Sequence, residues 1–420
     1  MKKLVALVLA AVMLLSLTSV FADAAEEKIT LTLWDIATES DANRPAYNAA
    51  LAYIAEKYPN IEIKEVSTEN QQYKIDIAAA MADPSTLPDI FFTWSGAFLG
   101  DFVEEGNVYA LNDVYANLET KDSLPEVMLA NGTFGGKSYA VPLTMNIVAM
   151  FANMDLLAQA GWDKVPETYE ELTKCCDDLV AAGITPFGCS GKETWCVTEY
   201  LEPIMEKFVG AETLGNIFNH VEGATWADAD IKASVDAFQD MIKKGYFDAN
   251  GMSLGNDEVK ANFIAGKYAF YQNGTWNCGD IAAAGDNFKV ALFPVMDAEK
   301  ATYGQVIGGP ADSLAVSAAG KDPALAAKVA FALGKKICQY SFIDAGSGLP
   351  AWTPDYDTSA VNYLTTAVSE MVAAADGMVL FGDTAMSADP ANIYLDYVSQ
   401  VYGGAIDGEG FVAGLTGDLG

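Results

Sequence analysis

The chain has 420 residues, of which 51% are hydrophobic and 19% are charged. This composition excludes wholesale disorder, and the length is sufficient for two lobes with separate hydrophobic cores. The formal net charge of −33 disfavours nucleic acid and anionic lipid as partners, because both carry charge of the same sign. We therefore expect a globular protein that binds neither.

The first residues have the pattern of a signal peptide. Two lysines precede an apolar run from Leu4 to Leu17, and Ala22-Asp23-Ala24 resembles a cleavage site. The run is shorter than the ~20 residues that a membrane-spanning helix needs. We expect residues 1–24 to be a cleaved signal peptide and the protein to be exported, either periplasmic or extracellular. No cysteine precedes Cys175, so no lipid-attachment cysteine is expected.

Strand and helix patterns alternate between residues 29 and 94. The β-rich run ITLTLWD is followed by apolar side chains at helical spacing, and the same alternation then repeats. This order implies a parallel sheet with right-handed crossovers. The predicted elements are strands at 29–35, 61–66 and 89–94 and helices at 44–58 and 71–81.

Further elements follow in the rest of the chain. Thr168 and Glu171 form a predicted capping box for a helix that reaches Ala181 and is closed by Gly183. Later apolar patterns predict helices at 229–244, 256–265, 323–336 and 363–375, and strands at 267–271, 289–294 and 313–316.

Three tryptophans stand at or just beyond the ends of predicted strands. They are Trp34, Trp94 and Trp276. In open α/β sheets this edge is where ligands bind, so each of these indoles is a candidate ligand contact as well as a candidate packing residue.

Little in the sequence points to catalysis. His220 is the only histidine, which argues against a histidine-rich zinc site and leaves one candidate base for a Ser–His arrangement. No P-loop, HExxH, EF-hand loop or GxSxG motif occurs. The many Asp and Glu residues leave open a carboxylate pair of the kind that secreted glycosidases use. Six cysteines without a CxxC spacing leave open both disulfides and buried free thiols.

Motifs spread over most of the chain resemble the extracellular solute-binding proteins of ATP-driven importers, in the sugar-type class that includes maltose-binding protein. Each motif is short, but seven of them occur in the order and spacing of that family. They are Leu31–Asp35 (LTLWD), Tyr58–Ile63 (YPNIEI), Leu87–Phe91 (LPDIF), Gly136–Pro142 (GKSYAVP), Ala160–Leu172 (AGW followed by VPETYEEL), Phe263–Trp276 (FIAGKYA followed by GTW), and Gly308–Ser317 (GG followed by LAVS).

The resemblance implies an α/β fold of two lobes joined by crossing hinge strands. Lobe one would comprise residues 25–143 and 294–340, and lobe two residues 144–293 and 341–420. The implied function is that of a non-catalytic, monomeric receptor without cofactor or metal. It would capture a sugar or oligosaccharide between the lobes and deliver it to the membrane permease of an ABC importer.

A sugar needs aromatic faces for its C–H patches and carboxylates or amides for its hydroxyls. Trp195 and Glu199 would share one face if their segment is helical, and Asn146 follows the crossing Pro142. The candidate ligand-binding residues are Trp34, Glu39, Trp94, Asn146, Trp195, Glu199, Trp276 and Asp312.

Two other functions fit parts of the pattern. A receptor for a polyamine or another small cation would also use carboxylates beside aromatic faces, and the acidic composition suits it. A secreted glycosidase is the alternative from another class. The identity and length of the sugar are not determined by the sequence.

Overall fold

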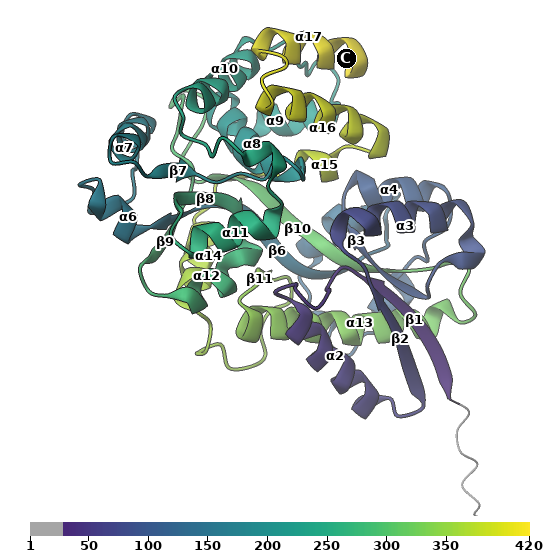
Figure 1. The fold of residues 1–420 in the computed structure, drawn as a ribbon. Helices are drawn as coiled ribbons and strands as arrows, with labels where there is room; N and C mark the ends of the chain where they lie inside the picture. Colours follow the sequence, from purple (N-terminus) through teal and green to yellow (C-terminus); the bar gives the residue numbers. More distant parts are fainter. Residues whose placement is uncertain (1–27) are drawn as a thin grey trace, which may run out of the picture.

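The computed structural model describes residues 28–420, so the predicted signal peptide lies outside the described residues. Two long strands, β6 (Val141–Asn153) and β10 (Gln305–Val316), run through the middle of the molecule, with one group of elements on either side (Figure 1). We call these groups the N-terminal side and the C-terminal side.

The N-terminal side confirms the alternation expected from the sequence. β1 pairs in parallel with both β2 and β3, and helices connect the three strands. This side comprises β1 (Ile29–Asp35), α2 (Arg44–Lys57), β2 (Ile61–Ser67), α3 (Asn70–Ala82), β3 (Ile90–Trp94), α4 (Ala97–Glu104), α5 (Asn112–Ala116), the small hairpin β4 (Thr133–Phe134) and β5 (Lys137–Ser138), and α13 (Pro323–Tyr340).

The C-terminal side is mainly helical. Its helices surround the short strands that extend the sheet beyond β6 (Figure 1). They are α6 (Met154–Gln159), α7 (Tyr169–Ala181), α8 (Trp195–Val209), α9 (Ala211–Phe218), α10 (Ala229–Lys243), α11 (Asn256–Ile264), α12 (Cys278–Ala284), α14 (Tyr363–Ala373), α15 (Gly382–Ala385), α16 (Ala388–Tyr402) and α17 (Gly408–Leu419).

One sheet connects the two sides, in the strand order β2-β1-β3-β10-β6-β8-β7. β10 is antiparallel to both β3 and β6, so the chain returns to the N-terminal side through this strand. The remaining strands are β7 (Thr185–Phe187), β8 (Tyr268–Gly274), β9 (Phe288–Ala291), β11 (Leu349–Pro350) and β12 (Gly377–Val379). Because β11 pairs with β6 and β12 with β10, the C-terminal segment is tied to the central strands.

β10 is much longer than the strand expected at 313–316. Gly308-Gly309-Pro310 is a sequence typical of a turn, yet it lies within the strand. Gly308 has φ 135°, and a Cβ there would collide with the Asn146 carbonyl oxygen of β6. The glycine therefore lets the two crossing strands approach each other, which the local pattern did not predict.

The predicted N-terminus of α7 is confirmed with one change. The Thr168 hydroxyl accepts the Glu171 N–H at 3.1 Å, as a capping box requires. The Glu171 carboxylate accepts the N–H of Glu167 at 2.9 Å instead of that of Thr168. The helix begins at Tyr169, and Gly183 follows its end with φ 75°.

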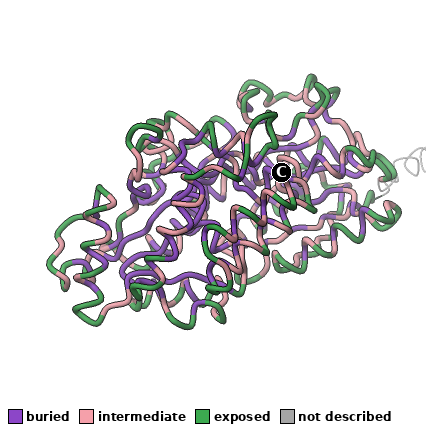
Figure 2. The backbone as a smooth tube through the Cα atoms, turned by 90° about the horizontal axis from the view of Figure 1, so that it is seen from above, coloured by how far each residue is buried: buried purple, intermediate pink, exposed green. Residues whose placement is uncertain are grey.

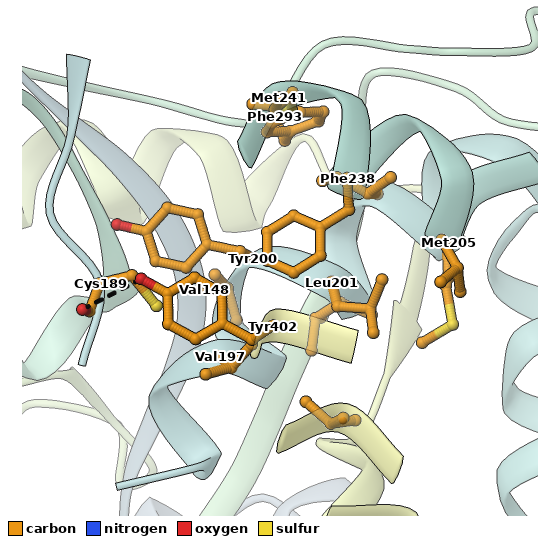
Figure 3. Close-up of a cluster of buried hydrophobic side chains, with 14 of the residues drawn as sticks. Val148, Cys189, Val197, Tyr200, Leu201, Met205, Phe238, Met241, Phe293 and Tyr402 are labelled. Atoms are coloured by element: carbon orange, nitrogen blue, oxygen red, sulfur yellow. Dashed lines mark hydrogen bonds between the residues drawn. The ribbon is translucent and has the colours of Figure 1, made fainter. Parts of the chain in front are cut away.

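The described residues bury separate hydrophobic cores on the two sides, with exposed residues at the periphery (Figure 2). Every residue of β6 is buried, because the strand is covered on both faces. On the C-terminal side Tyr200 of α8, Phe238 of α10 and Tyr402 of α16 meet in the larger core (Figure 3). A third cluster joins α11, α12 and α14 to the central strands.

All six cysteines are buried free thiols in the structure. Burial raises the pKa of Cys175, Cys278 and Cys338 to about 12, so these thiols are not reactive at neutral pH. Among residues 28–420, no helix combines the length and the apolar character that crossing a bilayer requires.

Candidate functional site

A cavity of about 590 Å³ lies between the two sides of the molecule. The first wall comes from the N-terminal side: the loop after β1 (residues 36–43), the start of α3 (residues 69–74) and Trp94. The second wall comes from the C-terminal side: residues 192–199, 255–260, 276–277 and 381–384. The floor is formed by Asn146 of β6 and residues 309–312 of β10. This volume is typical of small-molecule sites.

Six of the eight predicted site residues line this cavity. Trp94 lies in the first wall, Asn146 and Asp312 in the floor, and Trp195, Glu199 and Trp276 in the second wall. Residues that are up to 218 positions apart in the sequence, such as Trp94 and Asp312, are thus brought together by neighbouring strands.

Trp34 and Glu39 are outside the cavity lining. β1 ends at Asp35, as predicted, and Trp34, its penultimate residue, packs against the core of the N-terminal side. Glu39 is exposed in the loop, while its neighbours Thr38, Ser40 and Asp41 line the cavity.

The second wall is built on a pair of indoles. α8 begins at Trp195, and the short 3₁₀ helix Thr275–Asn277 carries Trp276 directly after β8. The two ring centroids are 5.9 Å apart with an interplanar angle of 59°, and Trp276 is 6.1 Å from the ring of Phe381. A side chain at Gly274 would collide with the Trp276 indole, so the glycine allows the ring to lie over the end of β8.

Glu199 lies one turn after Trp195 on the same face of α8, as the spacing predicts. Its side chain is buried, and burial, reinforced by Glu202 and Asp383, raises the pKa of its carboxyl well above the ordinary value. Glu199 Oε2 and Trp195 Nε1 have no hydrogen-bond partner within the described residues. Buried polar atoms are normally paired, so this wall offers hydrogen-bonding groups that a ligand can satisfy.

The floor holds a hydrogen-bonded carboxylate. Asp312 Oδ2 accepts the Thr144 hydroxyl at 3.0 Å and the Asn146 amide N–H at 3.2 Å. Asn146 Oδ1 in turn accepts the Thr275 hydroxyl at 3.1 Å, which links the floor to the second wall. Burial raises the pKa of Asp312 to about 6, although the bonds from Thr144 and Asn146 oppose this shift.

The first wall presents one indole that is already partly covered. The Lys74 ammonium lies 4.9 Å from the ring centroid of Trp94. Lys74 also bonds Asp383 Oδ2 of the second wall at 3.2 Å. In residues 28–420 this is the one ion pair that joins the two walls.

The loop of the first wall is anchored by Arg44, the only arginine in the chain. Its guanidinium donates to the Ala37 carbonyl at 2.7 Å and to the Ser67 hydroxyl at 3.0 Å, and it pairs with Glu65 at 2.7 Å. The fixed fork of donors holds the loop against β2 and so positions the lining residues that follow.

Sequence reasoning missed several lining residues. The largest omission is the C-terminal segment 381–384, which includes Phe381 and Asp383. It reaches the cavity because β12 pairs with β10, a contact that no local pattern announces. Lys74 and Asp41 were also missed. The one feature of the sequence that could have pointed to them is their position near the end of a predicted strand or helix.

The comparisons with known proteins agree with this geometry. The family model described as bacterial extracellular solute-binding protein matches residues 39–337. A multiple sugar-binding protein of Streptococcus mutans is 24% identical over 185 residues, which cover 43% of this chain and 44% of that protein. The matches to this and two further curated relatives span about half the length of each.

Solved structures match over nearly the whole chain. One, from a study of xylan utilization by the thermophilic bacterium Caldanaerobius polysaccharolyticus, has a TM-score of 0.88 and 30% identity, covering 93% of this chain and 100% of that chain. A chitin oligosaccharide binding protein has a TM-score of 0.85 and 22% identity, covering 93% and 98% of the two chains.

The family model covers well over half of the chain, and the two-sided α/β fold matches throughout. This protein belongs to the family of bacterial extracellular solute-binding proteins.

Proposed function

We propose that the protein is the substrate-binding receptor of an ABC importer and that it captures a sugar or oligosaccharide in the cavity between its two sides. One observation carries the proposal: indoles and hydrogen-bonding groups from both sides line a single cavity. Trp276 and Trp94 supply apolar faces, and Glu199, Asn146 and Asp312 supply polar groups. This combination suits a ligand with C–H patches and hydroxyls.

The proposed mechanism is closure of two lobes around the ligand. Since the two walls belong to different sides, only the closed form makes every contact, and the ligand shifts the open–closed equilibrium by its differential affinity. The closed form would then be recognised by the permease. We propose that the receptor acts as a monomer, is exported by the signal peptide, and releases its ligand unchanged.

We propose lobe boundaries within β6 and β10, close to those expected from the sequence. Two contacts favour a refinement. Lys207 of α8 donates to the carbonyl oxygens of Thr302 and Gln305, so residues 294–305 pack with lobe two. Trp352 is buried in the core of the N-terminal side and donates to the Pro142 carbonyl at 2.8 Å, so the segment around it packs with lobe one.

Isothermal titration and intrinsic fluorescence with the purified protein test the proposal. The names of the two solved structures suggest xylo-oligosaccharides and chito-oligosaccharides as first probes, with malto-oligosaccharides and a polyamine as further arms. Saturable binding of an oligosaccharide with a change in tryptophan fluorescence is the expected result. An affinity near micromolar, about −8 kcal/mol, would suit a receptor of this kind.

Two outcomes would contradict the proposal. Tight binding of spermidine with no binding of any saccharide would favour the cation-receptor alternative. Appearance of shorter saccharides during incubation, followed by chromatography, would favour a glycosidase. A Trp162→Phe variant serves as the control for the fluorescence measurement. Trp162 lies outside the cavity, and its indole N–H donates to Asp178.

A further inference from the structure

Acidic side chains outnumber basic ones in the lining of the cavity. Eight carboxylate side chains but only three lysines line it. Lys74 is bonded to Asp383, and Lys260 is bonded at 2.7 Å to Asp280, which is outside the lining. The third lysine, Lys192, is exposed. Of the eight lining carboxylates, Asp383 is the one that forms an ion pair within the described residues, while Lys260 and Lys192 act on Asp41 and Glu193 from a longer distance.

Like charges face each other across the mouth of the cavity. Asp41 and Glu69 belong to the first wall, and Glu193 and Asp257 belong to the second. Burial raises the pKa of Asp41; the Asn43 N–H and the Lys260 ammonium oppose this shift, and the charge of Asp257 adds to it. Burial likewise raises the pKa of Glu193, with contributions from Glu69 and Asp257. Bringing the walls together thus brings carboxylates together, and a positive group between them would relieve the repulsion.

A second observation is independent of the charges: two buried polar side chains that line the cavity have atoms without a hydrogen-bond partner within the described residues. The side chains of Glu199 and Ser347 are 3% and 1% exposed, both line the cavity, and Glu199 Oε2 and Ser347 Oγ have no hydrogen-bond partner within residues 28–420. These atoms are available for hydrogen bonds to a polar ligand. The indoles nearby can also hold a cation against their faces.

A metal ion is a poorer candidate for the positive group than an organic cation. Across the part of the chain that the structure describes, no three acidic, histidine or cysteine side chains converge closely enough to hold a metal. The carboxylates are spread along both rims, which suits an ammonium group carried on an extended molecule.

We propose that the receptor selects saccharides by charge: it binds an amine-bearing oligosaccharide more tightly than its neutral counterpart, and the neutral one more tightly than a uronate-bearing one. The proposal rests on the proposed function and specifies its ligand class. The ammonium group lies between Asp41 and Asp257, and a uronate carboxylate meets the same pair with the wrong sign.

Three trisaccharides with the same β-1,4 linkage provide a matched test. Those of glucosamine, glucose and glucuronic acid are similar in shape and carry positive, neutral and negative charge. Titration calorimetry of the full mature protein at pH 6 and low ionic strength is expected to give steps of about tenfold in affinity, in that order. Any other order, or no binding of the glucosamine trisaccharide, overturns the inference.

The failure of this inference is distinguishable from failure of the proposed function. Binding of a neutral oligosaccharide without charge discrimination would leave the receptor function intact and refute the charge selection alone. Lack of binding by every saccharide would refute both.

A double variant, Asp41→Asn with Asp257→Asn, tests whether these two carboxylates cause the charge preference. The Asn43 N–H that Asp41 accepts at 2.7 Å can be accepted by the amide oxygen as well. We expect the preference for the glucosamine trisaccharide over the glucose trisaccharide to fall from about tenfold to within about twofold. Glu119→Gln removes one exposed carboxylate outside the lining; it controls for the loss of acidic charge elsewhere on the protein and is expected to keep the full preference.

Discussion

The two walls of the cavity are built differently. The second wall rests on the core of the C-terminal side: Trp195 and Glu199 lie on the buried helix α8, and Trp276 is packed between Trp195 and Phe381. The first wall consists largely of a loop and a helix start, and its main anchor is Arg44. The second wall is therefore preformed, whereas the first wall depends on a few polar bonds for its shape.

The difference extends to the indoles. Trp276 has Trp195 and Phe381 as tilted aromatic neighbours, whereas Trp94 already has the Lys74 ammonium against its ring and makes T-shaped contacts with Phe92 and Phe98. A ring that is occupied on one face has less surface to offer a sugar. We infer that most of the binding free energy comes from the second wall.

The largest expected effect concerns these two indoles. Trp276→Ala should weaken saccharide binding by about 100-fold, because a buried aromatic contact is typically worth 2 kcal/mol or more at a binding hot spot, whereas Trp94→Ala should weaken it by about tenfold. Titration calorimetry measures both, and thermal unfolding checks that each variant is folded. Equal losses would contradict the comparison, and unchanged affinity in Trp276→Ala would contradict the site itself.

A smaller effect is expected on the free energy of unfolding, and it comes from Asp312 in the floor of the cavity. Asp312 has a pKa of about 6 in the folded protein, above the value of ~3.9 in an unfolded chain. Its contribution to stability is therefore complete below ~3.9 and is lost as the pH rises through about 6. Because the carboxyl is partly open to the cavity, we estimate about 1–2 kcal/mol.

Urea unfolding of wild type and Asp312→Asn at pH 4.5 and pH 7.5 measures this contribution. The free energy of unfolding of the variant should gain about 1–2 kcal/mol on wild type between the two pH values. Glu119→Gln is the control and should follow wild type. Parallel pH profiles of wild type and Asp312→Asn would show that burial does not govern this carboxyl.

The smallest effect is expected at the ion pair that joins the walls. Lys74→Gln removes the bond to Asp383, which is partly exposed to solvent, so binding should weaken by about threefold, chiefly through faster dissociation. Stopped-flow fluorescence measures the rate, with the exposed Lys137→Gln as control. If the ligand dissociates from Lys74→Gln as slowly as from wild type, the ion pair does not hold the walls together.

Local patterns predicted most elements because each has its own signal. The strand and helix alternation of residues 29–94 and the cap at Thr168 were both expected. Prediction failed for β10: the strand was expected only at 313–316, yet Gly308-Gly309-Pro310 also lies within it. Pairing with β3 and β6 decided the conformation of this strand.

The sequence by itself determined the α/β class, the family resemblance and six of the side chains that line the cavity. It could do so because periodicity, caps and short motifs depend on neighbouring residues. Only the tertiary structure decided that segment 381–384 completes the second wall, that Lys74 bridges to Asp383, and that carboxylates oppose each other at the mouth. These features depend on contacts between distant segments, which exist only once β10 and β6 have crossed.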